Sequence, residues 1–295
     1  MTELLIAALP GNDALADSLC RVLGAVRAPV EVRRFPDGET YLRYECELTE
    51  RNLVIVCTLD RPDAKFLPLV FAASAARGLG AASVGLVAPY LAYMRQDLEF
   101  KSGEAVTSAI FAIALSRHID WLVTVDPHLH RRSSLGEIYS VPAIALHAAP
   151  LLAEWIAKNV AKPVLVGPDG ESEQWVAAVA RDAHAPYVVL EKIRHGDRDV
   201  TVSIPEVERW RGHTPVLVDD IVSTARTMIE TVAHLIGAGM KAPTCIAIHG
   251  IFADDAYSNL RDAGAVQVVT TNTILHETNR MDLTALIADC VGRLM

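Results

Sequence analysis

The sequence predicts an α/β fold with two domains, each a mainly parallel sheet flanked by helices. Short apolar runs of β-type residues alternate with longer helical patterns along the whole chain. Strands that are apolar throughout, with helices between them, are typical of parallel sheets covered on both faces. The alternation occurs twice, and 295 residues correspond to about two domains of ordinary size.

In the first half, apolar runs predict four buried strands, at residues 4–9, 53–58, 82–88 and 121–126. The intervening residues 64–79 and 104–118 are rich in alanine and leucine and predict helices.

The second half repeats the alternation of strands and helices. Strands are predicted at residues 163–169, 186–192, 200–204, 215–220, 244–250 and 266–272. Helices are predicted at residues 172–184, 225–237, 253–263 and in the C-terminal segment 282–295. We place the domain boundary near residues 145–150, which gives domains of 1–147 and 148–295, and docking of the last helix on the N-terminal domain stays open.

Composition excludes several classes of protein. A net charge of −9 argues against a general nucleic-acid surface, which usually carries a basic excess. Five cysteines, widely spaced and without a Cys-x-x-Cys pair, argue against a disulfide framework or a cysteine zinc site and suit a reducing cytosol. The N-terminus has no basic region and meets Pro10-Gly11 early, and no apolar run reaches ~18 residues. We therefore expect a cytoplasmic protein that binds neither nucleic acid nor membrane.

Polar segments follow five of the predicted strands, at residues 89–97, 127–132, 168–174, 191–197 and 219–227. Ligands of open parallel sheets bind beyond the carboxyl ends of the strands. Solvation alone explains one polar strand end, but five that contain Asp, His, Lys and Arg favour a binding site.

The segment "VLVDDIVSTART", residues 216–227, predicts a ligand with a diol and a phosphate. Backbone N–H groups at a helix start hold phosphate, and the hydroxyls of Thr224 and Thr227 add donors. Asp219 and Asp220 would repel a phosphate but accept hydrogen bonds from sugar hydroxyls. A helix capped by Ser223 or Thr224 is the alternative, and it leaves the two acids unexplained.

This segment resembles the phosphoribosyl-diphosphate (PRPP) loop of type I phosphoribosyltransferase-like proteins. Further segments resemble those of ribose-phosphate diphosphokinases, in order along nearly the whole chain. They are "RRFPDGETYLRYE" (33–45), "PYLAYMRQD" (89–97), "TVDPHLH" (124–130), "GPDG" (167–170), "EKIR" (191–194), "HGIFADDAYSNL" (249–260) and "VVTTNTI" (268–274). Some of them look closer to archaeal-type variants.

The resemblance implies two phosphoribosyltransferase-like domains, the N-terminal one on the ATP side and the C-terminal one on the ribose 5-phosphate side. It implies transfer of the β,γ-diphosphoryl group of ATP to the 1-hydroxyl of ribose 5-phosphate, which yields PRPP and AMP for nucleotide biosynthesis. It also implies a requirement for Mg²⁺. In the family, the segment that corresponds to residues 33–45 reaches the site of a neighbouring subunit. This implies a homo-oligomer, a dimer or a multiple of dimers.

The resemblance assigns a role to each matching residue. ATP contacts are implied for Phe35, Asp37, Gly38, Glu39, Arg95 and Gln96. Ribose 5-phosphate contacts are implied for Arg194, Asp219, Asp220, Ser223, Thr224, Ala225, Arg226 and Thr227. Mg²⁺ positioning is implied for His128 and Asp169, and stabilisation of charge on the transferring phosphorus for Lys192 and Arg194. Two alternatives stay open: a zinc ion on the two histidines of "HLH", and an exposed hairpin rather than a closing loop after Arg194.

The phosphate loop departs from the family pattern. Thr224-Ala225-Arg226-Thr227 stands where Thr-Gly-Gly-Thr is usual, and Ser223 replaces a common third acid. A positive φ at Ala225 or Arg226 would cost about 1–2 kcal/mol. Arg226 would then pair with the phosphate or fill its pocket. Glu171 and Glu173 are further departures, because small residues are frequent there.

These departures affect the expected site for the phosphoryl acceptor, ribose 5-phosphate, more than the expected site for the donor, ATP. They leave open a diphosphokinase for a related sugar phosphate and a non-catalytic regulatory homologue. The segments "FPDGE" and "RQD" disfavour a phosphoribosyltransferase.

Overall fold

The computed structural model describes residues 3–129, 131–167, 173–194, 200–203 and 207–295. The chain divides into two compact units. Unit 1 comprises Met1–Leu146, Thr273–Leu275 and Leu283–Met295, and unit 2 comprises His147–Asn272 and His276–Asp282. None of the described helices is long and apolar enough to cross a membrane.

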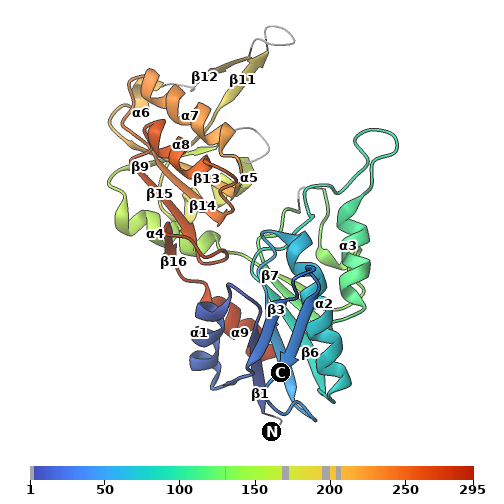
Figure 1. The fold of residues 1–295 in the computed structure, drawn as a ribbon. Helices are drawn as coiled ribbons and strands as arrows, with labels where there is room; N and C mark the ends of the chain where they lie inside the picture. The colour runs from blue at the N-terminus through green and yellow to red at the C-terminus, as the bar shows by residue number, and fades with distance from the viewer. Residues whose placement is uncertain (1–2, 130, 168–172, 195–199, 204–206) are drawn as a thin grey trace. The chain divides into compact units, whose positions relative to one another are not determined.

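Unit 1 is built on a six-stranded parallel sheet in the order β2-β1-β5-β6-β7-β8 (Figure 1). Its strands are β1 (Leu4–Ala8), β2 (Val26–Arg27), β5 (Asn52–Val56), β6 (Ser83–Ala88), β7 (Trp121–Val125) and β8 (Ala143–Leu146). Gly85 is required in β6, because a Cβ there would lie 2.0 Å from the ring of Trp121 on β7.

The helices of unit 1 are α1 (Asp13–Leu23), α2 (Pro62–Gly78), α3 (Thr107–Ser116) and α9 (Thr284–Leu294), with a 3₁₀ turn η1 at Leu135–Glu137. The C-terminal α9 packs against α1 and β7, so the end of the chain returns to unit 1. Strands β3 (Val30–Arg34) and β4 (Thr40–Tyr44) form a separate antiparallel hairpin.

Unit 2 repeats the design with a parallel sheet in the order β10-β9-β13-β14-β15-β16. Its strands are β9 (Pro163–Gly167), β10 (Tyr187–Val189), β13 (Thr214–Val222), β14 (Thr244–Gly250), β15 (Gln267–Thr271) and β16 (Asn279–Met281). Its helices are α4 (Ala149–Asn159), α5 (Glu173–Asp182), α6 (Val207–Trp210), α7 (Arg226–Gly237) and α8 (Ala256–Asp262). A second antiparallel hairpin joins β11 (Glu191–Arg194) to β12 (Val200–Ser203).

The predicted fold class is confirmed, since each unit is a parallel sheet with flanking helices. The predicted strands at β5, β6, β7, β9 and β14 are buried along most or all of their length, whereas Tyr187 of β10, within the predicted strand 186–192, is exposed.

Several expectations change. Helices α1 and α4 and strands β2, β8 and β16 were not predicted, and the predicted strand 186–192 divides into β10 and the start of β11. Strand β13 continues to Val222 instead of ending at Asp220, so the acid pair lies within the strand. The β3–β4 hairpin escaped prediction because its half-exposed strands do not form an apolar run.

Candidate active site

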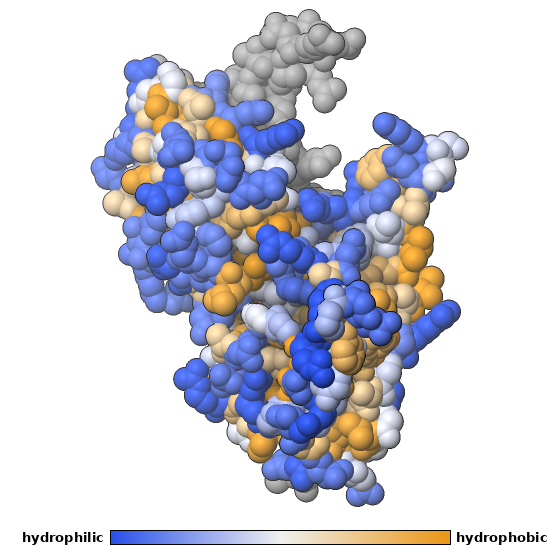
Figure 2. Space-filling view, viewed as in Figure 1, coloured by the Kyte–Doolittle hydropathy of each residue, from blue (hydrophilic) through white to orange (hydrophobic). Residues whose placement is uncertain are grey.

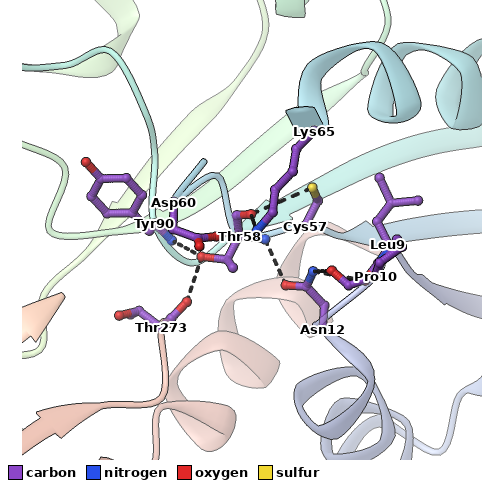
Figure 3. Close-up of polar contacts among 9 residues, drawn as sticks. All are labelled: Leu9, Pro10, Asn12, Cys57, Thr58, Asp60, Lys65, Tyr90 and Thr273. Carbon is purple, nitrogen blue, oxygen red and sulfur yellow. Dashed lines mark hydrogen bonds and ion pairs between the residues drawn. The ribbon is translucent and has the colours of Figure 1, made fainter. Parts of the chain in front are cut away.

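The carboxyl ends of three unit 1 strands are joined by one polar network (Figure 3). The side chain of Asn12, after β1, accepts a hydrogen bond from the Thr58 N–H, after β5, at 2.8 Å. The Thr58 hydroxyl accepts from the Tyr90 N–H, after β6, at 3.3 Å and donates to the Thr273 carbonyl at 2.7 Å. Lys65 of α2 donates to the Thr58 carbonyl at 2.9 Å. This network holds the sheet edge from which the candidate loops leave.

The loop Pro89–Asp97 after β6 is fixed midway by Tyr93. Tyr93 has a left-handed backbone, with φ of 62°, which a bulky residue adopts only when its surroundings hold it there. Its ring packs against Phe111 of α3 at 4.8 Å between centroids, and its hydroxyl donates a hydrogen bond to Asp63 of α2. Burial, together with that hydrogen bond, raises the pKa of Tyr93 to about 12.

The end of the same loop presents Arg95 and fixes Gln96. The Gln96 side-chain oxygen accepts from the Thr107 hydroxyl at 3.3 Å, and its carbonyl accepts from the Ser108 N–H at 3.2 Å. Arg95 is exposed. Its guanidinium therefore lies on a rigid support beside an anchored glutamine, which suits recognition of a phosphate.

The loop after β7 lies beside this one. The Val125 N–H donates to the Pro89 carbonyl at 3.3 Å, and the Asp126 N–H donates to the Leu146 carbonyl at 2.8 Å. Asp126 has φ of 33°, so the chain turns sharply before His128, which is half-buried. The predicted phosphate and metal residues of unit 1 thus come from neighbouring strand ends.

The predicted metal pair is only partly described. His128 is placed, whereas Asp169 lies outside the described residues, as does His130, on which the zinc alternative depends. Within the described ranges, no group of three or more His, Cys, Asp or Glu side chains could hold a metal ion. Mg²⁺ prefers oxygen ligands and retains waters, so His128 would position such an ion directly or through a bound water, with phosphates supplying further oxygens.

The segment Phe35–Glu39 forms the turn of the β3–β4 hairpin. The Phe35 N–H donates to the Glu39 carbonyl at 2.8 Å, and the Gly38 N–H donates to the Phe35 carbonyl at 2.9 Å. Gly38 has φ of 95°, a conformation that favours glycine. Asp37 accepts from the Glu39 N–H at 3.2 Å. The turn is exposed throughout, so its acids and the Phe35 ring are accessible.

A cavity of about 230 Å³ lies between this hairpin and α2, and it carries the three cations Arg33, Arg34 and Lys65. Two of them are already paired, Arg33 with Glu31 and Lys65 with Asp60. We therefore do not count the cavity as part of the candidate site.

In unit 2, Asp219 and Asp220 lie where β13 extends beyond β9. Pairing with β9 ends at Leu217, whereas pairing with β14 continues as far as Val222. Both acids are half-buried, and Asp219 accepts from the Asp220 N–H at 2.9 Å. The acids thus occupy a rigid strand rather than a loop, next to the turn that leads into α7.

The turn from β13 into α7 has no side-chain cap. Ala225 occupies the N-cap position with φ of 58°, and no side chain hydrogen-bonds to the cap, so the alternative of a Ser223 or Thr224 cap is wrong. The Ala253 N–H donates a hydrogen bond to the Ser223 carbonyl at 3.0 Å, which fixes the turn. The first N–H groups of α7 therefore remain open to an anion. Thr224, Arg226 and Thr227 are exposed around them.

Lys192 and Arg194 both belong to β11, opposite Val202 and Val200 of β12. Their side chains, and the following residues 195–199, lie outside what the structure describes. The predicted closing loop is therefore not described, although the strands on either side of it pair as a hairpin.

Three residues without an assigned role, although they lie in the polar segments 89–97 and 127–132, join the two loops of unit 1: Asp97, Arg131 and Arg132. Their only sequence signal is their place in "RQD" and "HRR", directly after predicted site residues.

Two parallel-sheet units carry polar loops at the carboxyl ends of their strands, which is where open α/β sheets bind their ligands. Two family models match: "N-terminal domain of ribose phosphate pyrophosphokinase" at residues 4–118 and "Phosphoribosyl transferase domain" at residues 134–283.

The relatives agree with the family models. A ribose-phosphate pyrophosphokinase of Sulfurisphaera tokodaii is 31% identical over 274 residues, which is 92% of this chain and 93% of the relative. Another, of Methanothermobacter thermautotrophicus, is 32% identical over 286 residues, 97% of this chain and 99% of the relative. The chain therefore belongs to the ribose-phosphate pyrophosphokinase family. A crystal structure of phosphoribosylpyrophosphate synthetase from Mycobacterium smegmatis shares the fold, with a TM-score of 0.87 at 22% identity over 99% of both chains.

Proposed function

We propose that the protein is an enzyme that transfers the β,γ-diphosphoryl group of ATP to the 1-hydroxyl of ribose 5-phosphate, giving PRPP and AMP for nucleotide biosynthesis. One observation carries the proposal. The relatives named ribose-phosphate pyrophosphokinase match this chain over nearly their full length and its own, across both units.

The N-terminal domain, residues 1–147, is assigned to ATP. Arg95 on its rigid loop contacts the phosphates, and Gln96 contacts the adenine. Phe35 stacks on the base, and Asp37, Gly38 and Glu39 hold adenine and ribose edges. The exposure of the Phe35–Glu39 turn supports this assignment, because an exposed turn is accessible to a ligand or a neighbouring subunit.

The C-terminal domain, residues 148–295 without its last helix, is assigned to ribose 5-phosphate. Asp219 and Asp220 accept hydrogen bonds from the 2- and 3-hydroxyls. The open N–H groups of α7 bind the 5-phosphate, together with the side chains of Ser223, Thr224, Arg226 and Thr227. The uncapped helix start at Ala225 supports this assignment.

The reaction forms a bond between the sugar 1-oxygen and the β-phosphorus while the bond from that phosphorus to the α,β-bridging oxygen breaks. AMP leaves with the bridging electron pair, and the proton of the 1-hydroxyl is released to water. Lys192 and Arg194 stabilise the charge that develops on the phosphoryl oxygens, since such transfers depend on positioning and electrostatics. His128 and Asp169 would hold Mg²⁺, directly or through water, and the ion neutralises phosphate charge.

We further propose a cytoplasmic homo-oligomer, a dimer or a multiple of dimers, without nucleic-acid or membrane partners. An apolar patch over α3, orange in Figure 2, supports self-association. Its exposed side chains include Ile110 (59% exposed) and Ile113 (54%). Contact of this apolar surface with water is unfavourable, so burial against a second subunit would stabilise it.

A related sugar phosphate is the second candidate acceptor. Its basis is the sequence departure at Ala225 and Arg226, and the relatives named ribose-phosphate pyrophosphokinase do not favour it.

The test incubates the folded protein with Mg²⁺, ATP and ribose 5-phosphate and quantifies AMP and PRPP by chromatography. We expect both products in equal amounts, and none without the sugar phosphate. AMP that appears only with another sugar phosphate would assign the second acceptor. Absence of AMP with every sugar phosphate would refute a catalytic role.

A further inference from the structure

We infer that Asp97, Arg131 and Arg132 form a clamp that positions the Arg95–Gln96 loop against the His128 loop, and that all three are positioning residues for ATP. The inference rests on the proposed function, because it assigns ATP to these two loops. None of the three is among the residues that the resemblance places in the site.

The clamp consists of contacts from one loop to the other. The Arg131 guanidinium donates to Asp97 Oδ1 at 3.1 Å. The Arg132 guanidinium donates to the Asp97 carbonyl at 3.1 Å and lies 3.4 Å from the Ser108 hydroxyl. Two successive arginines thus hold both the side chain and the backbone of one aspartate.

The two loops are now joined at both ends. At their bases the Val125 N–H donates to the Pro89 carbonyl, and at their far ends Asp97 meets Arg131 and Arg132. Arg95, Gln96 and His128 lie between these two connections. These two connections, together with the anchors of Tyr93 and Gln96 on α3, therefore restrict the separation of Arg95 and His128.

Arg132 has its own support. Glu137 of η1 lies 3.8 Å from its guanidinium and also accepts from the Ser133 N–H at 2.7 Å. The guanidinium of Arg131 lies 5.2 Å from the centre of the Phe100 ring. Each arginine is thus oriented by a neighbour other than Asp97, as precise positioning requires.

The burial of Asp97 argues against a purely stabilising role. Its side chain is 2% exposed, and Oδ2 has no hydrogen-bond partner among the described residues. A buried carboxylate that lacks part of its hydrogen bonding is costly, and an apolar residue of similar size often stabilises more. Placement of the neighbouring Arg95 and Gln96 gives a reason for keeping the acid.

The test compares Arg131→Gln and Arg132→Gln with Arg117→Gln, which removes an exposed arginine at the end of α3 outside both loops. Binding of Mg²⁺ and a non-hydrolysable ATP analogue is measured by calorimetry, and the KM values for ATP and ribose 5-phosphate from AMP formation. We expect the clamp variants to raise the Kd of the analogue and the KM for ATP about tenfold, since small misplacements of binding groups are costly. The KM for ribose 5-phosphate should stay within about twofold, and Arg131→Lys should recover part of the loss, because it retains the charge.

Several outcomes decide the inference. It is overturned if the clamp variants bind the analogue as Arg117→Gln does, or if both KM values rise together with a fall in thermal midpoint. A double variant, Asp97→Asn with Arg131→Gln, should lose no more than the stronger single variant, and additive losses would contradict a shared contact. If the wild type binds the analogue but makes no AMP, the proposed reaction fails while the binding comparison still decides the clamp. If it does not bind the analogue, both fail.

Discussion

The loops of unit 1 to which we assign ATP and the turn of unit 2 to which we assign ribose 5-phosphate are held in different ways. In unit 1, side chains anchor the loops: Tyr93 on Phe111, Gln96 on Thr107, and Asp97 on two arginines. In unit 2, the turn after β13 depends on the backbone, with a left-handed Ala225 and no side-chain cap. A multiply charged ligand such as a nucleotide needs side chains placed precisely, whereas a single phosphate can be bound by helix N–H groups.

The largest expected effect concerns Lys192 on β11 and tests whether its charge contributes to catalysis. Lys192→Ala should lower kcat by roughly two or more decades, because it removes a donor to the transferring phosphoryl oxygens. Rates of AMP formation at saturating substrates measure this. Lys158→Ala on α4, an exposed lysine that pairs with Glu154, is the matched control and should keep its rate. Normal turnover of Lys192→Ala would remove this residue from the mechanism.

The next effect tests the acid pair on the acceptor side. Asp219→Asn and Asp220→Asn should each raise the KM for ribose 5-phosphate by about tenfold or more, because a hydrogen bond to a charged group contributes about 1.5–3 kcal/mol. The KM for ATP should change little, which separates the acceptor side from the donor side. Asp262→Asn, at the exposed end of α8, is the control. Equal changes in both KM values would contradict the division between the two units.

A smaller effect tests the strained turn. Ala225→Gly should stabilise the protein by about 1 kcal/mol, because glycine adopts the φ of 58° without the clash of a Cβ. The thermal unfolding midpoint measures this. Ala238→Gly, at the other end of the same helix with φ of −79°, should give no gain. If Ala225→Gly instead lowers the midpoint, the left-handed turn is not under strain.

The smallest effect tests the anchor of the donor loop. The pKa of Tyr93 lies at about 12, above its ordinary value of 10, because of burial and the hydrogen bond to Asp63. The folded state therefore favours the neutral phenol, and this contribution is complete below about pH 10 and is lost as the pH rises towards 12.

Tyr93→Phe removes that hydrogen bond and retains the ring contact with Phe111. We expect a loss of about 0.5–1.5 kcal/mol at neutral pH and a shallower fall in stability above pH 10. Thermal midpoints across the alkaline range give the comparison, with Tyr257→Phe on α8 as control. An identical alkaline slope in the wild type and Tyr93→Phe would contradict the assigned pKa.

Much of the fold followed from local pattern. The apolar runs at β5, β6, β7, β9 and β14 became buried central strands, because a strand covered on both faces must be apolar at every position. The β3–β4 hairpin did not follow, since its strands mix charged and apolar residues and most of their positions are only half-buried or exposed. The loops that follow β6, β7 and β13 were predicted, but the geometry of each loop was not.

The sequence by itself determined the fold class and the family, and it indicated the segments of the proposed site, because alternating apolar runs and motif order are local properties of the chain. Tertiary structure decided that β13 runs past its acid pair and that Ala225 takes a left-handed turn. It also decided that Asp97 meets Arg131, 34 residues further along the chain. These features depend on pairing and packing between distant segments, which no window of sequence contains.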